Sequence, residues 1–343
     1  MVRDVLVAAL PTSGAVVMAA GILSVGFRLA GQGVLSSLLL GVATIAWLFV
    51  SSALLALGLR GRPGALSARV GPRSLTAVAA SSVLGVRCAE LGWSWAAGTL
   101  LLVAFVVFVS ILPAVLAHWQ RPAGGASFLL PVAVESLALL ASSLAIQVRA
   151  PWLALAGAGL LVVGVSAYLV VLLGFDPHQL AAGYGDQWIA GGALALAALA
   201  GTKTAMASQA LEPLLPAGAI EGAALGLWML ALAWLPALVL GEARAPRRRG
   251  YASERWATVF PLAMYAVSTL QLGKLERLDA LVDLGGCLIW VGLAAWLFTT
   301  IGLTRQVAST LRLRAVFDGR ATSPYPAARP PARCNTSHTR FRS

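Results

Sequence analysis

A few charged residues stand inside apolar stretches of this sequence, and they are the side chains best suited to chemistry. Arg87 and Glu90 are three residues apart, so on a helix they share one face and can pair. Even when paired, Arg87 can supply positive potential to an anion. Because ionisable residues inside a membrane usually pair or serve a function, these two residues are either a structural ion pair or part of a functional site.

Glu135 is a third charged residue in an apolar stretch, with no basic residue close to it in the sequence. It is a protonatable group, a pore residue exposed to water, or a partner in the Arg87 cluster. Two charges near the ends of another apolar stretch have simpler roles. Lys203 is expected to extend its amine to the outer surface, and Asp186 is expected to cap a helix N-terminus.

The remaining polar residues argue against other classes of protein. His118, His178 and His338 lie in loops or in the tail, and the sequence contains no zinc-binding, nucleophile-elbow, phosphate-loop or dinucleotide-binding motif. The net charge of +12 comes from arginines in alternate loops and the tail, as the positive-inside rule expects of a membrane protein. We therefore predict no enzymatic activity, no catalytic residue, no cofactor, no metal and no nucleic-acid partner.

The stretch Trp256–Lys274 is apolar enough to enter a bilayer but is an awkward transmembrane helix. Pro261 removes a backbone donor and is expected to kink or locally open it. Tyr265 belongs to a group of polar residues that lipid disfavours. A helix of this kind usually lines something other than lipid, so Phe260 is either the plug of a pore or a packed core residue.

Composition places these stretches in a membrane protein. Hydrophobic residues make up 59% of the chain and charged residues 11%, whereas soluble domains carry about 25% charged residues. A crossing helix needs roughly 20 mostly apolar residues. The sequence predicts an all-α integral membrane protein whose ten spans form five helical hairpins. These spans are residues 9–28, 34–58, 74–91, 94–117, 127–148, 152–174, 187–207, 217–240, 256–273 and 281–303.

The loop arginines predict the orientation and the location. Most of them fall in loops on the same side as the two termini, so both termini are expected in the cytoplasm and the protein in the cell inner (plasma) membrane. Residues 1–305 form the predicted transmembrane domain. Residues 306–343 are rich in Arg, Pro and Ala and are predicted to be a basic, disordered cytoplasmic tail.

The odd-numbered spans hold most of the prolines, small residues and charges that disturb a regular apolar helix. This alternation predicts odd-numbered helices inside, around a central pore, and even-numbered helices outside. The residues expected to line the pathway or act as hinges are Pro11, Gly14, Pro131, Gly191, Gly192, Pro261 and Tyr265.

The eighth span carries a separate pattern of small residues. Gly218, Gly222 and Gly226 recur at every fourth position. Such a pattern lets helices approach closely, so it predicts packing either within the chain or between subunits.

Five stretches together resemble the tellurite-resistance/dicarboxylate transporter family. That family includes bacterial TehA-type channels, plant SLAC-type anion channels, and fungal malate and sulfite carriers. The stretches that resemble its odd-numbered helices are Pro11–Gly26, Val83–Arg87, Leu129–Val132, Asp186–Ala195 and Trp256–Leu262. The resemblance covers about residues 5–305.

The resemblance implies five helical hairpins in a quasi-fivefold arrangement, a homotrimer with one pore in each subunit, and an aromatic gate at Phe260. Glu135 departs from the pattern, because a neutral polar residue is expected on the fifth helix. The leading hypothesis is passage of small inorganic or organic anions through a Phe-gated pore. The alternatives are a proton-coupled exporter or carrier of C4-dicarboxylate, sulfite or tellurite-related anions, and a membrane protein that transports nothing.

Overall fold

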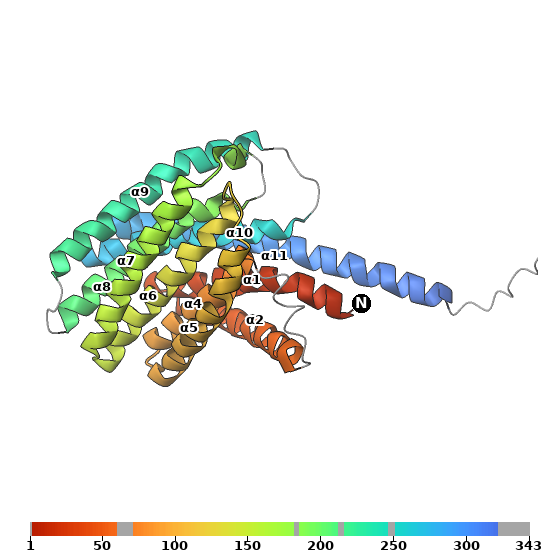
Figure 1. The fold of residues 1–343 in the computed structure, drawn as a ribbon, viewed down its shortest axis with the longest axis horizontal. Coiled ribbons are helices and arrows are strands. Elements are labelled where there is room, and N and C mark those ends of the chain that lie inside the picture. The colour runs from red at the N-terminus through yellow and green to blue at the C-terminus, as the bar shows by residue number, and fades with distance from the viewer. Residues whose placement is uncertain (1, 60–70, 182–184, 212–215, 246–250, 322–343) are drawn as a thin grey trace, which may run out of the picture. The chain divides into compact units, whose positions relative to one another are not determined.

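The apolar stretches form long helices, because a backbone that crosses a bilayer must satisfy its own hydrogen bonds. The computed structural model describes residues 2–59, 71–181, 185–211, 216–245 and 251–321, with the side chains of the first helix described from Gly14 onward. Regular structure in these residues is helical (Figure 1). The α-helices are α1 (Val2–Leu29), α2 (Gly33–Leu59), α4 (Thr76–Glu90), α5 (Ser94–Ala117), α6 (Leu129–Val148), α7 (Pro151–Leu173), α8 (Trp188–Ala210), α9 (Ala217–Arg244), α10 (Trp256–Glu276) and α11 (Asp279–Ala321).

Each of the ten predicted spans corresponds to one of these helices. Short 3-10 helices occur beside three of them: η1 (Pro72–Leu75), η2 (Gly125–Phe128) and η4 (Ser253–Arg255) lead into α4, α6 and α10. A fourth, η3 (Pro177–Ala181), lies between α7 and α8. By length and composition, 7 helices in the described residues can cross a membrane: α2, α5, α6, α7, α8, α9 and α11.

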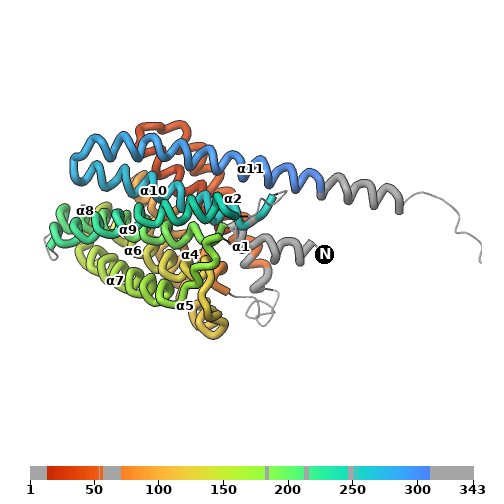
Figure 2. The backbone as a smooth tube through the Cα atoms, turned by 90° about the horizontal axis from the view of Figure 1, so that it is seen from above, coloured from red at the N-terminus to blue at the C-terminus, as the bar shows by residue number. Residues whose placement is uncertain are grey.

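Consecutive helices pack as hairpins, as the short loops predict. α1 packs on α2, α4 on α5, α6 on α7 and α8 on α9. The α6–α7 pair and the α8–α9 pair run side by side in both views (Figure 1, Figure 2). The turns need left-handed backbone, which Gly31 and Gly92 supply at φ 78 and which Arg149 adopts at φ 50.

One helix from each hairpin belongs to a closed ring. α1 packs against α4, α4 against α6, α6 against α8, α8 against α10, and α10 against α1. We call these five the inner helices. The inner helices are more deeply buried than their hairpin partners. In the most apolar stretch of each helix, 89% of the residues of α6 and 94% of those of α8 are buried, against 17% for α5. This burial follows the predicted alternation of inner and outer helices, while the pore at the centre stays a prediction.

The outer helices present apolar side chains that nothing in the described residues covers, such as Leu38, Trp95 and Leu173. This is the surface that lipid would solvate. On α9, a Cβ added at Gly218, Gly222 or Gly226 would meet no heavy atom within 4 Å. Packing within the chain therefore does not explain this glycine pattern over the described residues.

The last helix is longer than its sequence predicts. The tenth span was expected to end at residue 303, whereas α11 continues to Ala321. Residues 306–321 are rich in Leu, Arg and Ala, which favour helices, and the prolines begin only after them. The prediction of a disordered tail is therefore wrong for this segment, and residues 322–343 lie outside the described residues.

Candidate functional site

Arg87 is held in a fixed position inside the helical bundle. Only 2% of its surface is exposed. Its Nε donates to Ser24 Oγ at 3.2 Å and to Ser36 Oγ at 3.3 Å, and its Nη2 donates to Ser36 Oγ at 3.1 Å. The two serines also join α1 to α2, because each hydroxyl donates to the other's backbone carbonyl at 2.7 Å. These contacts leave Nη1 free to face the neighbouring carboxylate.

That carboxylate belongs to Glu90, which lies between two cations. Arg87 Nη1 is 3.7 Å from one carboxylate oxygen, and Lys203 Nζ is 3.7 Å from the other. The Arg87–Glu90 pair forms as the three-residue spacing predicts. The prediction for Lys203 is wrong, since this residue is only 9% exposed and its amine turns inward to Glu90. Once the ammonium is buried, the Glu90 carboxylate partly offsets the cost of removing its charge from water.

Glu135 occupies a different environment. Its exposed fraction is 0%, and neither carboxylate oxygen has a hydrogen-bond partner among the described residues. It faces the outer hairpin helix, because a Cβ added at Gly164 of α7 would lie 2.6 Å from Glu135 Cγ. This burial disagrees with a water-exposed side chain, and the ion pair of Arg87 goes to Glu90 instead.

Phe260 and Pro261 lie on α10, and Pro261 contacts the inner helix α8. Phe260 is 4% exposed. A Cβ added at Gly192 of α8 would lie 2.8 Å from Pro261 Cβ, so this glycine permits the contact between α8 and α10. The helix α10 runs from Trp256 to Glu276 with Pro261 inside it.

Tyr265 and Gly191 form a second contact next to this one. The Tyr265 hydroxyl donates to the Ala231 carbonyl of α9 at 2.8 Å. A Cβ at Gly191 would collide with the same hydroxyl. These two residues therefore join α8, α9 and α10, and the hydroxyl points toward an outer helix.

The other predicted hinge residues lie in the first and third hairpins. A Cβ at Gly14 would lie 2.5 Å from Thr76 Oγ1, so Gly14 brings α1 close to α4. Pro131 is buried in the first turn of α6. Pro11 lies in α1, and its side chain is outside the described residues.

An ion-pair network that the sequence did not reveal joins the segments before three inner helices. Arg73 in η1 contacts Asp186 at 2.7 Å and Glu254 at 3.8 Å. The predicted capping role of Asp186 is wrong, because Gln187 is the N-cap residue of α8 and makes no side-chain capping bond. Burial raises the pKa of the Asp186 carboxyl, and the Arg73 guanidinium opposes that shift. No sequence pattern predicted this network, because its three residues lie far apart along the chain.

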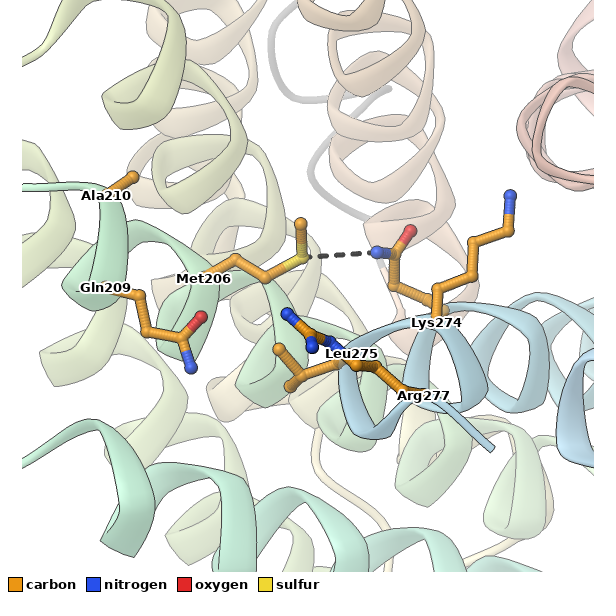
Figure 3. A pocket seen from close by; sticks show the side chains of 7 residues that line it. Met206, Gln209, Ala210, Lys274, Leu275 and Arg277 are labelled. Carbon is orange, nitrogen blue, oxygen red and sulfur yellow. Dashed lines mark hydrogen bonds between the residues drawn. The ribbon is translucent and has the colours of Figure 1, made fainter. Parts of the chain in front are cut away.

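At the opposite end of the inner helices, α1, α8 and α10 end close to one another. Lys274 at the end of α10 donates to the Leu29 carbonyl at the end of α1, at 2.5 Å. A cavity of about 400 Å³ opens between the ends of α8 and α10, lined in part by Met206, Gln209 and Arg277. In Figure 3, Lys274 extends away from Met206 and Gln209. The described residues contain no group of three His, Cys, Asp or Glu side chains placed to hold a metal ion.

Comparison with known proteins identifies the family. Residues 10–304 match the family model of the voltage-dependent anion channel, SLAC1. Two relatives are 31% identical over 130 residues: the uncharacterized membrane proteins MT1776 and Rv1735c of Mycobacterium tuberculosis, from strains CDC 1551 / Oshkosh and ATCC 25618 / H37Rv. Each match covers 36% of this chain and 65% of the relative, so the chain spans less than two thirds of their length. The apolar helices and the family match make this a multi-pass membrane protein, and the chain belongs to the SLAC1 family of voltage-dependent anion channels.

Proposed function

We propose that this protein lets small inorganic or organic anions cross the membrane through the ring of inner helices in each subunit. Membership of an anion channel family supports anions as the substrate class. The observation that carries the proposal is the closed packing order of five buried helices inside five exposed ones. A ring of this kind isolates its interior from lipid, so polar groups can line a path there.

Phe260 is the proposed gate of this path. It is buried on an inner helix and adjoins Pro261, where α8 and α10 touch. An aromatic side chain there closes the path by packing, and a small movement of the side chain or of α10 opens it. The glycines at 14, 191 and 192 permit close packing of the inner helices, and Pro11 and Pro131 are the proposed hinges.

Anion flux in proteoliposomes tests the gate. We expect Phe260→Ala to raise chloride or nitrate flux severalfold over wild type while keeping selectivity against cations. The matched control is Phe128→Ala, because Phe128 is also buried but its ring packs against the rings of Tyr168 on the outer helix α7 and of Phe175, with centroid distances of 5.1 and 5.4 Å. Equal flux in the folded Phe260→Ala variant and wild type would refute the gate.

Proton-coupled export is a second candidate, favoured by the buried carboxyl of Glu135, which has no hydrogen-bond partner in the described part of the chain. Such a group can carry a proton, because an ionised carboxylate is costly in this surrounding. The substrates of such a carrier would be C4-dicarboxylate, sulfite or tellurite-related anions. Uptake driven by a proton gradient in wild type, and lost in Glu135→Gln, would favour the carrier over the channel.

The proposal includes a homotrimer in the inner (plasma) membrane with both termini in the cytoplasm. The loop arginines support this orientation. The open glycine face of α9 is compatible with packing between subunits. Light scattering in detergent measures the mass of the assembly, and a monomer would contradict the trimer.

A further inference from the structure

The contact between Glu90 and Lys203 crosses the ring. Glu90 ends α4 and Lys203 lies late in α8, and α6 stands between these helices in the packing order. The outer side of α6 is occupied by α7, which packs along it. The side chains of Glu90 and Lys203 therefore meet on the inner side of α6, where the proposed path runs.

The charges of this cluster do not balance. Glu90 brings one negative charge to the two positive charges of Arg87 and Lys203. Arg28, at the exposed end of α1, adds positive potential to the same group. An excess of buried positive charge is costly and favours the arrival of another anion.

The contacts of Glu90 are also loose. Both of its cation contacts measure 3.7 Å, which is longer than a charged hydrogen bond of about 2.7–2.9 Å. Arg87, by contrast, is anchored by Ser24 and Ser36 and keeps its position without Glu90. Arg87 is thus fixed more firmly than the carboxylate beside it.

We propose that Arg87 and Lys203 form an anion-binding site across the ring and that Glu90 is a tethered carboxylate that occupies it. A permeating anion binds there when the Glu90 side chain moves away. The expected ligands are small monovalent anions, carboxylates included, because the built-in occupant is itself a carboxylate. This inference rests on the proposed anion pathway and adds a competitive site near the end where the inner helices finish.

Binding measured without transport gives the first test. Acetate and chloride are titrated into purified protein while the melting temperature is followed. We expect Glu90→Gln to bind acetate about tenfold more tightly than wild type, because one charge within about 4 Å of the site is removed while its volume is kept. Lys203→Met added to Glu90→Gln should abolish the gain.

Glu276→Gln is the matched control, because it removes one exposed negative charge at the same end without touching the cluster. An equal gain in Glu276→Gln would assign the effect to surface potential and overturn the site. Glu90→Ala gives a second variant: acetate, which can enter the vacated space, should restore its lost thermal stability, and no restoration would count against the site.

Flux separates this inference from the proposed function. If Phe260→Ala conducts anions while Glu90→Gln changes neither binding nor flux, the pathway stands and the Glu90 site is wrong. If Glu90→Gln gains anion affinity while no variant conducts, the site stands and the transport proposal fails.

Discussion

Replacing Gly192 by alanine perturbs the contact on which the arrangement of α8 and α10 depends. The added Cβ would lie 2.8 Å from both Pro261 Cβ and Pro261 Cγ, and 3.1 Å from Pro261 Cα. Carbon atoms pack best at about 3.5–4.0 Å, so the two helices must separate by roughly 0.7 Å. The proline ring is rigid and cannot rotate away, so the displacement falls on the backbone of α10 beside Phe260.

The size of the effect follows from two opposing terms. Overpacking a well-filled contact costs about 1–3 kcal/mol. Alanine in place of glycine stabilises a helix by about 0.5–1 kcal/mol, because it loses less backbone entropy on folding. Gly159 on the outer helix α7 provides the control, because its Cβ would meet nothing within 4 Å and only the second term applies. The two variants should therefore differ in stability by about 1–3 kcal/mol, with Gly159→Ala the more stable.

Thermal unfolding in detergent measures this difference, and anion flux measures its consequence. We expect Gly192→Ala to melt several degrees below Gly159→Ala, and to leak anions because Phe260 is displaced with α10. Equal melting temperatures for the two alanine variants would refute the close α8–α10 contact. A lower melting temperature with unchanged flux would separate this contact from the gate.

Two other variants probe buried and bridging carboxyls. Because the oxygens of Glu135 have no partner among the described residues, Glu135→Gln should shift the melting temperature by only a few degrees; a loss of about 3 kcal/mol or more would reveal a charged partner. The pKa of Asp186 is raised by burial, so its contribution to stability is full below the unfolded pKa of about 3.9 and declines as pH rises through the folded pKa. Asp186→Asn should therefore flatten the fall in melting temperature above about pH 4, and an unchanged pH profile would contradict this.

The sequence predicts local structure well where one physical requirement dominates. A segment that crosses lipid must be apolar and helical over roughly 20 residues, so each predicted span corresponds to a helix. The same reasoning underestimated the length of α11, because residues with high helix propensity continue beyond its apolar segment. The three-residue spacing of Arg87 and Glu90 was enough to predict their pair, since one helix determines it.

Local sequence patterns could not predict the role of a residue whose partner lies far away along the chain. Lys203 and Asp186 were assigned to the surface and to a helix cap, but their partners, Glu90 and Arg73, come from other hairpins. Glu135 was open to three interpretations until packing placed it against Gly164 of α7.

The amino-acid sequence by itself therefore determined the helices and the alternation of buried and exposed ones, because hydrophobicity and helix geometry act within about 20 residues. The residues expected to line a path stay a prediction. Tertiary structure alone decided which charges of different hairpins meet. The order of helices around the ring joins α4 to α8 through Glu90 and Lys203, and α8 to α10 through Gly192 and Pro261. Ion pairing and close packing act over a few ångströms, and only the folded ring brings such distant residues within that range.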